Sequence, residues 1–211
     1  MPHPNRVTPF GTLIATPERG LLMGNRGLLH DDQGHIRRLY ALRRWILCVL
    51  QFEGRHRKIL QPGRYTELFV LDEATGLAAG HRPCAECQQN RFRLFRSRWA
   101  QANSEAAGSD TPGVDRIDAV LHAERLEGRR EKRTYLAPVG ELPTGVMVLL
   151  DDVPWLVLDD AIVPWSAGGY GPRSPKPVGK VRVLTPMSTV RAIARWYPVE
   201  IHPSANEVLS P

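Results

Sequence analysis

The 211-residue chain contains only three cysteines, four lysines and no long apolar run. Three cysteines cannot build the disulfide framework of a small secreted protein. Charged residues, proline or glycine interrupt every apolar segment before it reaches the roughly 20 residues that a membrane-spanning helix needs. No apolar stretch follows the first six residues, as one would in a secretory signal. These absences predict a cytoplasmic protein.

The basic side chains are unevenly distributed along the chain. Residues 1–100 carry 16 basic and 8 acidic side chains and residues 101–211 carry 12 and 14, so the net charge of +6 comes from the N-terminal half. Arginine supplies 24 of the 28 basic residues, and its planar guanidinium suits bidentate contacts with phosphate. A preference for arginine codons in a GC-rich genome is the alternative explanation. The basic half favours a polyanionic partner such as nucleic acid.

The N-terminal half shows strand and turn patterns typical of a globular protein. β-Branched and aromatic residues predict antiparallel strands at 45–52, 57–60 and 65–71. The glycines of segment 20–27 predict a tight loop.

Two helices are expected next along the chain. Asp72 is suited to cap a short helix that ends at Gly80. Residues 88–103 contain no helix breaker and place three aromatic side chains on one face, which predicts an amphipathic helix. Those side chains are Phe92, Phe95 and Trp99.

The most specific motif is the segment His81-Arg-Pro-Cys-Ala-Glu-Cys87. Two cysteines separated by two residues can place both thiolates on one tetrahedral zinc ion. The positive end of the helix that follows lowers the pKa of thiols at its start. We therefore expect Cys84 and Cys87 to form a metal-binding pair, with zinc as the cofactor.

The longer segment Glu73-Ala-Thr-Gly-Leu-Ala-Ala-Gly-His-Arg-Pro-Cys-Ala-Glu-Cys87 resembles the knuckle of the Ada-type metal-binding domain of DNA-repair proteins. The resemblance covers roughly residues 45–100 and implies a small zinc-binding fold that contacts DNA. That family completes its zinc site with two cysteines about thirty residues upstream, one of which accepts a methyl group. Here residues 53–57 contain no cysteine, so the methyl-acceptor activity is not carried over.

Any further metal ligands must come from outside the CxxC pair. His56 is the first candidate by its position in the resemblance and Cys48 by its chemistry. A third protein ligand with water in the fourth position makes a zinc site catalytic, whereas four protein ligands make it structural. The remaining candidates are His81, His30 and His35.

A second constellation suggests an enzyme. His122-Ala-Glu124 and Pro83-Cys-Ala-Glu-Cys87 are the two halves of the zinc deaminase signature. In that chemistry one histidine and two cysteines hold the zinc, and the glutamate moves protons. Deaminases place the histidine half first, whereas here the order is reversed. His122 and Glu124 are the candidate catalytic residues of this alternative.

The fold class expected is α+β, since strands and helices do not alternate regularly. Antiparallel strands with the zinc knuckle lead into a helix, and a β-rich C-terminal part follows. We expect a basic, Ada-like metal-knuckle region at 1–103, a linker at 104–114 and a β-rich region at 115–211, or one continuous domain. Within the last region, strands are predicted at 145–150, 155–158, 161–163 and 181–184, and helices at 117–125 and 185–196.

The function that these features predict is zinc-dependent contact with nucleic acid, in DNA repair or in DNA or RNA processing. The alternatives are a metal-dependent hydrolase or deaminase-like enzyme, and a structural zinc site in a protein with another role. The arginines expected to contact phosphate are Arg55, Arg57, Arg82, Arg91, Arg93, Arg96 and Arg98.

Overall fold

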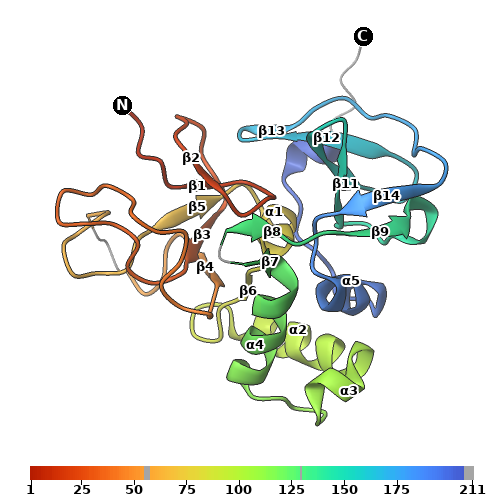
Figure 1. Ribbon diagram of the computed structural model, residues 1–211, viewed down its shortest axis with the longest axis horizontal. Helices are drawn as coiled ribbons and strands as arrows, with labels where there is room; N and C mark the ends of the chain where they lie inside the picture. The colour runs from red at the N-terminus through yellow and green to blue at the C-terminus, as the bar shows by residue number, and fades with distance from the viewer. Residues whose placement is uncertain (55–57, 129, 207–211) are drawn as a thin grey trace.

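A computed structural model describes residues 1–54, 58–128 and 130–206 (Figure 1). This part of the chain forms a mixed α+β structure with five α-helices and three β-sheets. The predicted α+β class is confirmed. No helix in the described ranges is both long and apolar enough to span a membrane.

The first sheet contains six strands in the order β2-β1-β5-β3-β4-β6. β1 pairs with β5 and β4 pairs with β6 in parallel, while the other neighbours are antiparallel. The sheet is therefore mixed and not purely antiparallel. Its strands are β1 (Arg6–Val7), β2 (Leu13–Ile14), β3 (Leu22–Asn25), β4 (Ile46–Val49), β5 (Leu68–Val70) and β6 (Arg82–Pro83).

The predicted loop at 20–27 is wrong, because this segment contains β3, which separates β4 from β5. The predicted return strand is wrong as well for residues 58–60, and residue 57 lies outside the described residues. Gly24 shows why glycine occurs within β3: a Cβ there would lie 3.3 Å from Cβ of Leu68 and 3.4 Å from Nε2 of His81. Close packing explains this glycine without a turn.

The short helix α1 (Glu73–Ala79) forms as predicted. The Asp72 side chain accepts hydrogen bonds from the backbone N–H of Thr75 at 2.8 Å and from its hydroxyl at 2.7 Å. Gly80 ends the helix with a left-handed φ of 95°, a conformation that costs glycine little. Every residue of α1 is buried, so the helix is an internal element.

Two carboxylates at the start of α1 bind the C-terminal segment of the chain. Asp72 accepts hydrogen bonds from the Tyr170 hydroxyl at 2.8 Å and the His202 backbone N–H at 2.9 Å. Glu73 accepts from the Tyr197 hydroxyl at 2.5 Å and the Glu200 backbone N–H at 2.9 Å. These bonds satisfy two buried carboxylates and fix the middle of the chain to residues far along it.

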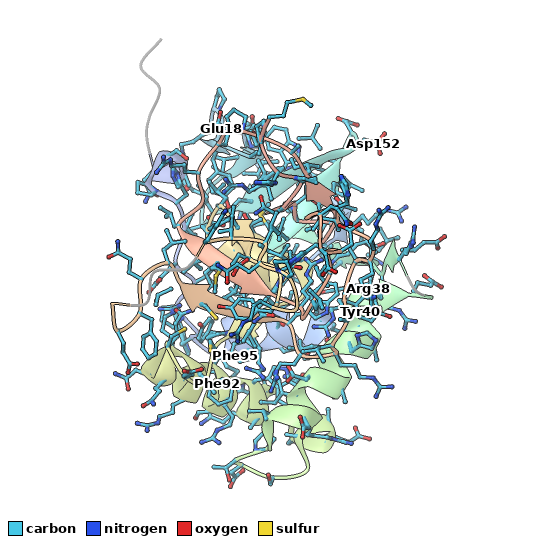
Figure 2. The ribbon with its side chains drawn as sticks, turned by 90° about the vertical axis from the view of Figure 1, so that its left-hand side faces the viewer. Glu18, Arg38, Tyr40, Phe92, Phe95 and Asp152 are labelled. Carbon is cyan, nitrogen blue, oxygen red and sulfur yellow. The ribbon has the colours of Figure 1, made fainter. Side chains whose placement is uncertain are left out.

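Three helices follow the CxxC segment: α2 (Gln89–Ala102), α3 (Ser104–Ala107) and α4 (Val114–Arg125). The predicted aromatic face of α2 is confirmed, since Phe92, Phe95 and Trp99 are buried. Figure 2 shows Phe92 and Phe95 on the side of α2 that faces the body of the protein. The expected linker 104–114 holds α3 and the start of α4, and its Ala107 is part of a hydrophobic cluster.

The C-terminal part is β-rich, as predicted. Its six-stranded sheet has the order β13-β12-β11-β10-β14-β9, with every neighbouring pair antiparallel. The two-stranded sheet β7–β8 lies between the two larger sheets (Figure 1). The elements are β7 (Leu126–Glu127), β8 (Glu131–Lys132), β9 (Tyr135–Pro138), β10 (Met147–Leu150), β11 (Val153–Val157), β12 (Ile162–Ser166), β13 (Gly169–Tyr170), β14 (Lys180–Val183) and α5 (Met187–Ala194).

The hydrophobic cores connect the two halves of the chain. In one cluster, Phe95 and Trp99 of α2 pack with Val148 of β10 and Ile193 of α5. In a second cluster, α1 packs against residues of the C-terminal sheet, including Met147. Since apolar burial is the main favourable term in folding, the two halves stabilise each other.

Two buried arginines stack on one tryptophan in the interior. The guanidinium carbons of Arg26 and Arg125 lie 3.7 and 4.2 Å from a ring centroid of Trp45, and all three residues are 0% exposed. Backbone carbonyls of Gly11 and Gly80 accept their hydrogen bonds at 2.7 and 2.6 Å. Part of the positive charge counted in the sequence therefore lies in the core, where it cannot reach a polyanion.

Lys132, whose ammonium donates to the Ala78 carbonyl, makes stability depend on pH. Burial, with the nearby charges of Arg125 and Arg26, lowers the pKa of Lys132 from 10.5 to about 7. Between pH 7 and 10 the Lys132 side chain is protonated in the unfolded chain but not in the folded chain, so it makes the free energy of unfolding rise with pH by at most about 1.4 kcal/mol per unit.

Urea unfolding at several pH values should show that Lys132→Met loses this rise, whereas Lys176→Met keeps it. Equal slopes for wild type and Lys132→Met would contradict the assignment.

Candidate metal centre

The three cysteines come together although Cys48 lies 36 positions before Cys84. Cys48 is on β4, Cys84 directly follows β6, and Cys87 lies in the turn before α2. The parallel pairing of β4 with β6 brings the first two together, and the Cys84 N–H donates to the Leu47 carbonyl at 2.8 Å. The three Sγ atoms lie within 4.8 Å of one another. Their spacing lets one metal ion contact all three.

Backbone amides point at the sulfurs. The Glu86 N–H donates to Cys84 Sγ at 3.4 Å. The backbone of Cys87 acts to lower the pKa of Cys84, and the backbone of Val49 acts to lower that of Cys87. Hydrogen bonds to the charged form stabilise a thiolate, so the turn that contains Cys84 and Cys87 favours the thiolate form of cysteine.

The pKa values of the cysteine thiols are shifted in different directions. Hydrogen bonds from the Cys48 and Cys87 thiols lower the pKa of Cys84 well below its ordinary value. The pKa of Cys48 is raised far above its usual range, chiefly by the hydrogen bonds that it shares with Cys84 and Cys87. The first thiolate therefore forms at Cys84, and a metal ion would replace the protons of the other two.

Of the further ligands that the sequence suggested, Cys48 is the one that the structure brings to the CxxC pair. His81 is wrong as a ligand, because both ring nitrogens are taken: Nε2 accepts from Arg26 Nε at 3.1 Å, and Nδ1 bonds to the Gly76 carbonyl. His30 bonds to Thr66, and His35 pairs with Asp31. His56 lies outside the described residues, so its prediction stays a prediction.

His122 and Glu124 do not join the cysteines in a deaminase-like site. Glu124 accepts bonds from the Ser188 backbone N–H at 3.1 Å and its hydroxyl at 2.6 Å. Arg125 donates to Nδ1 of His122, whose ring contacts Tyr40 edge to face. In the described ranges, the metal-competent cluster consists of the three cysteines alone. His122 and Glu124 have structural contacts in place of the predicted catalytic roles.

Two of the arginines predicted to contact phosphate form ion pairs with other parts of the protein instead. Arg82 is 1% exposed and forms a two-bond ion pair with Asp118 at 2.9 and 2.7 Å, so this prediction is wrong. Arg91 is bound by Glu73, by Glu200 at 2.7 Å and by the Pro198 carbonyl at 2.7 Å. These contacts occupy the guanidinium that was expected to bind phosphate.

The other predicted arginines differ in position. Arg93 is exposed on α2, whereas Arg96 and Arg98 are half-buried. Arg96 stacks on Phe92 at 5.7 Å, and Arg98 donates to Gln101 at 3.4 Å. Arg55 and Arg57 lie outside the described residues.

A cavity of about 320 Å³, not predicted from the sequence, opens beside the sulfurs. Its walls come from β3, β4, β5, the segment after β6 and described residues of the connection between β4 and β5, and the sheet brings these distant segments together. Alternation of side chains along β5 is the one local signal that could have indicated which residues point to this face. Besides the three cysteines the cavity is lined by Met23, Asn25, Ile46, Val49, Leu50, Phe52, Ile59, Tyr65, Glu67, Phe69 and Glu86.

Comparison with protein-family models, with curated proteins and with solved structures gives no match. The site is therefore interpreted from its own chemistry. Three neighbouring cysteines that could hold a metal ion are its defining feature.

Proposed function

We propose that this protein binds zinc through Cys48, Cys84 and Cys87. The observation that carries the proposal is the approach of the three Sγ atoms to within 4.8 Å. Thiolates are soft ligands that select zinc, copper(I) or iron–sulfur clusters. The backbone N–H groups aimed at two of the sulfurs suit zinc thiolates, since such outer contacts orient metal ligands.

Metal analysis of purified protein tests the zinc site. We expect about one zinc per chain in the wild type and at least about 100-fold weaker binding in Cys48→Ser, more than the loss of an outer contact costs. His35→Ala is the matched control, because it removes an exposed candidate ligand outside the cluster and should leave zinc unchanged. The proposal is wrong if the purified wild-type protein contains no metal and does not bind added zinc after its cysteines have been reduced.

We propose further that the zinc-bound chain contacts nucleic acid through α2. Two features support this: the helix begins two residues after Cys87, and its Arg93, Arg96 and Arg98 form no ion pair within the described part of the chain. The resemblance to the Ada-type domain favours the same partner. Guanidinium groups that neutralise phosphates release counterions, so the affinity should fall steeply with salt.

A binding titration at several salt concentrations tests the α2 contact. Changing Arg93, Arg96 and Arg98 to glutamine is expected to weaken binding of a DNA or RNA duplex by at least tenfold and to reduce the salt slope by about 2–3. The matched control changes three exposed cations elsewhere, Arg130, Lys180 and Arg182. Equal loss in both triple variants would point to net charge alone, and no binding at low salt would end the proposal.

A further inference from the structure

The cavity beside the cysteines has a metal-binding wall. Cys48, Cys84 and Cys87 all line it, and in the described ranges no histidine or carboxylate joins their cluster. Zinc is four-coordinate in proteins. A zinc ion on the three sulfurs therefore has one coordination position left, and the space next to the sulfurs is the cavity.

The other walls are mainly apolar and partly aromatic. Met23, Ile46, Phe52, Ile59 and Phe69 contribute carbon surface. A volume of about 320 Å³ lies at the lower end of small-molecule sites. Such a space accommodates one or two fused rings and excludes a folded chain or a nucleotide polymer.

Charge restricts the occupant further. Zn²⁺ with three thiolates carries a net negative charge, and the carboxylate of Glu67 also lines the cavity. Burying an additional anion there is unfavourable, because like charges repel strongly where water is scarce. A neutral donor atom avoids this cost. Ring nitrogen of the imidazole type is a neutral ligand that zinc accepts readily.

We propose that the cavity binds a small neutral nitrogen heterocycle, whose ring nitrogen takes the fourth position on the zinc held by Cys48, Cys84 and Cys87. The inference rests on the proposed zinc site. Phe52 and Phe69 contribute aromatic carbon to the wall that would pack against the heterocycle, and Asn25, Tyr65 and Glu67 line the cavity with polar groups. The site thus recognises a base-like ring, which is separate from the phosphate contacts proposed for α2.

Cobalt(II) in place of zinc tests this directly, because the visible bands of a thiolate-bound cobalt ion report its fourth ligand. We expect imidazole and benzimidazole to change these bands saturably while the metal content stays constant. Benzimidazole should bind at least tenfold more tightly, since its second ring buries more apolar surface at about 25 cal/mol per Å². If cobalt is bound by all three cysteines and neither imidazole nor benzimidazole changes its visible bands, the inference is wrong.

Two variants separate the possible results. Ile59→Trp fills part of the cavity and should weaken benzimidazole binding at least tenfold, whereas Leu28→Trp, at an exposed position outside the cavity, should not. If the wild type is silent and His56→Ala responds, that histidine is the fourth ligand and the inference is wrong. Failure to load any metal contradicts the proposed zinc function, whereas loaded but unresponsive protein contradicts only the heterocycle site.

Discussion

Replacing Asp118 by alanine is expected to lower the free energy of unfolding by about 3–5 kcal/mol. Asp118 on α4 accepts two hydrogen bonds from Arg82 on β6, and their side chains are 4% and 1% exposed. The change leaves a guanidinium buried without its counter-charge, and that uncompensated charge is the source of the cost. Denaturant unfolding of the purified variant measures it.

A double replacement distinguishes loss of the charge partner from loss of packing. Arg82→Met with Asp118→Leu removes both charges and keeps apolar volume, so it should recover much of the stability lost in Asp118→Ala. The matched control is Asp160→Ala, which breaks the exposed pair with Arg173 at 2.5 Å and should cost less than about 1 kcal/mol. A loss below that level in Asp118→Ala would contradict the buried-pair assignment.

Removing zinc from the loaded protein is expected to lower the melting temperature by about 8–16 °C. At a free zinc concentration 1,000 times the Kd, binding stabilises the folded state by about 4 kcal/mol. For a chain of this size each kcal/mol corresponds to about 2–4 °C. The sulfurs join β4, the end of β6 and the turn before α2, so the first sheet should lose most of this stability.

Thermal unfolding with and without a chelator measures the effect of zinc. Cys48→Ser should differ by at most about 3–6 °C between the two conditions, because 100-fold weaker binding leaves at most about 1.4 kcal/mol of stabilisation at the same zinc concentration. The C-terminal sheet keeps its apolar clusters without metal, so the chelated protein should remain folded at 25 °C. An identical melting temperature for loaded and chelated wild type would argue against zinc at these cysteines.

Local patterns predicted the helices better than the first sheet. The Asp72 cap, Gly80 and the aromatic spacing of α2 all act within a few residues, so sequence alone located both helices. β3 was misread, because the glycine within it and those beside it are also typical of turns and its neighbours β4 and β5 are far along the chain. Strand order depends on such distant pairing.

The candidate site was predictable only in part, for the same reason. The CxxC pair is visible in the sequence, and Cys48 was a candidate by chemistry, but only the parallel β4–β6 pairing places it beside Cys84. Arginine was read as surface charge, whereas Arg26 and Arg82 are buried. Cation–π contacts and ion pairs with distant residues determine that burial, and neither leaves a local pattern.

The bonds from Asp72 and Glu73 to the C-terminal segment have a consequence for synthesis on the ribosome. Their partners Tyr197 and His202 are added 124 and 130 positions later. When the first sheet leaves the exit tunnel, the start of α1 still lacks the groups that satisfy its two carboxylates. Domains usually fold in order as they emerge. Here the start of α1 acquires these partners only when nearly the whole chain has been made, so a nascent chain stalled before residue 197 should present an exposed, protease-sensitive α1.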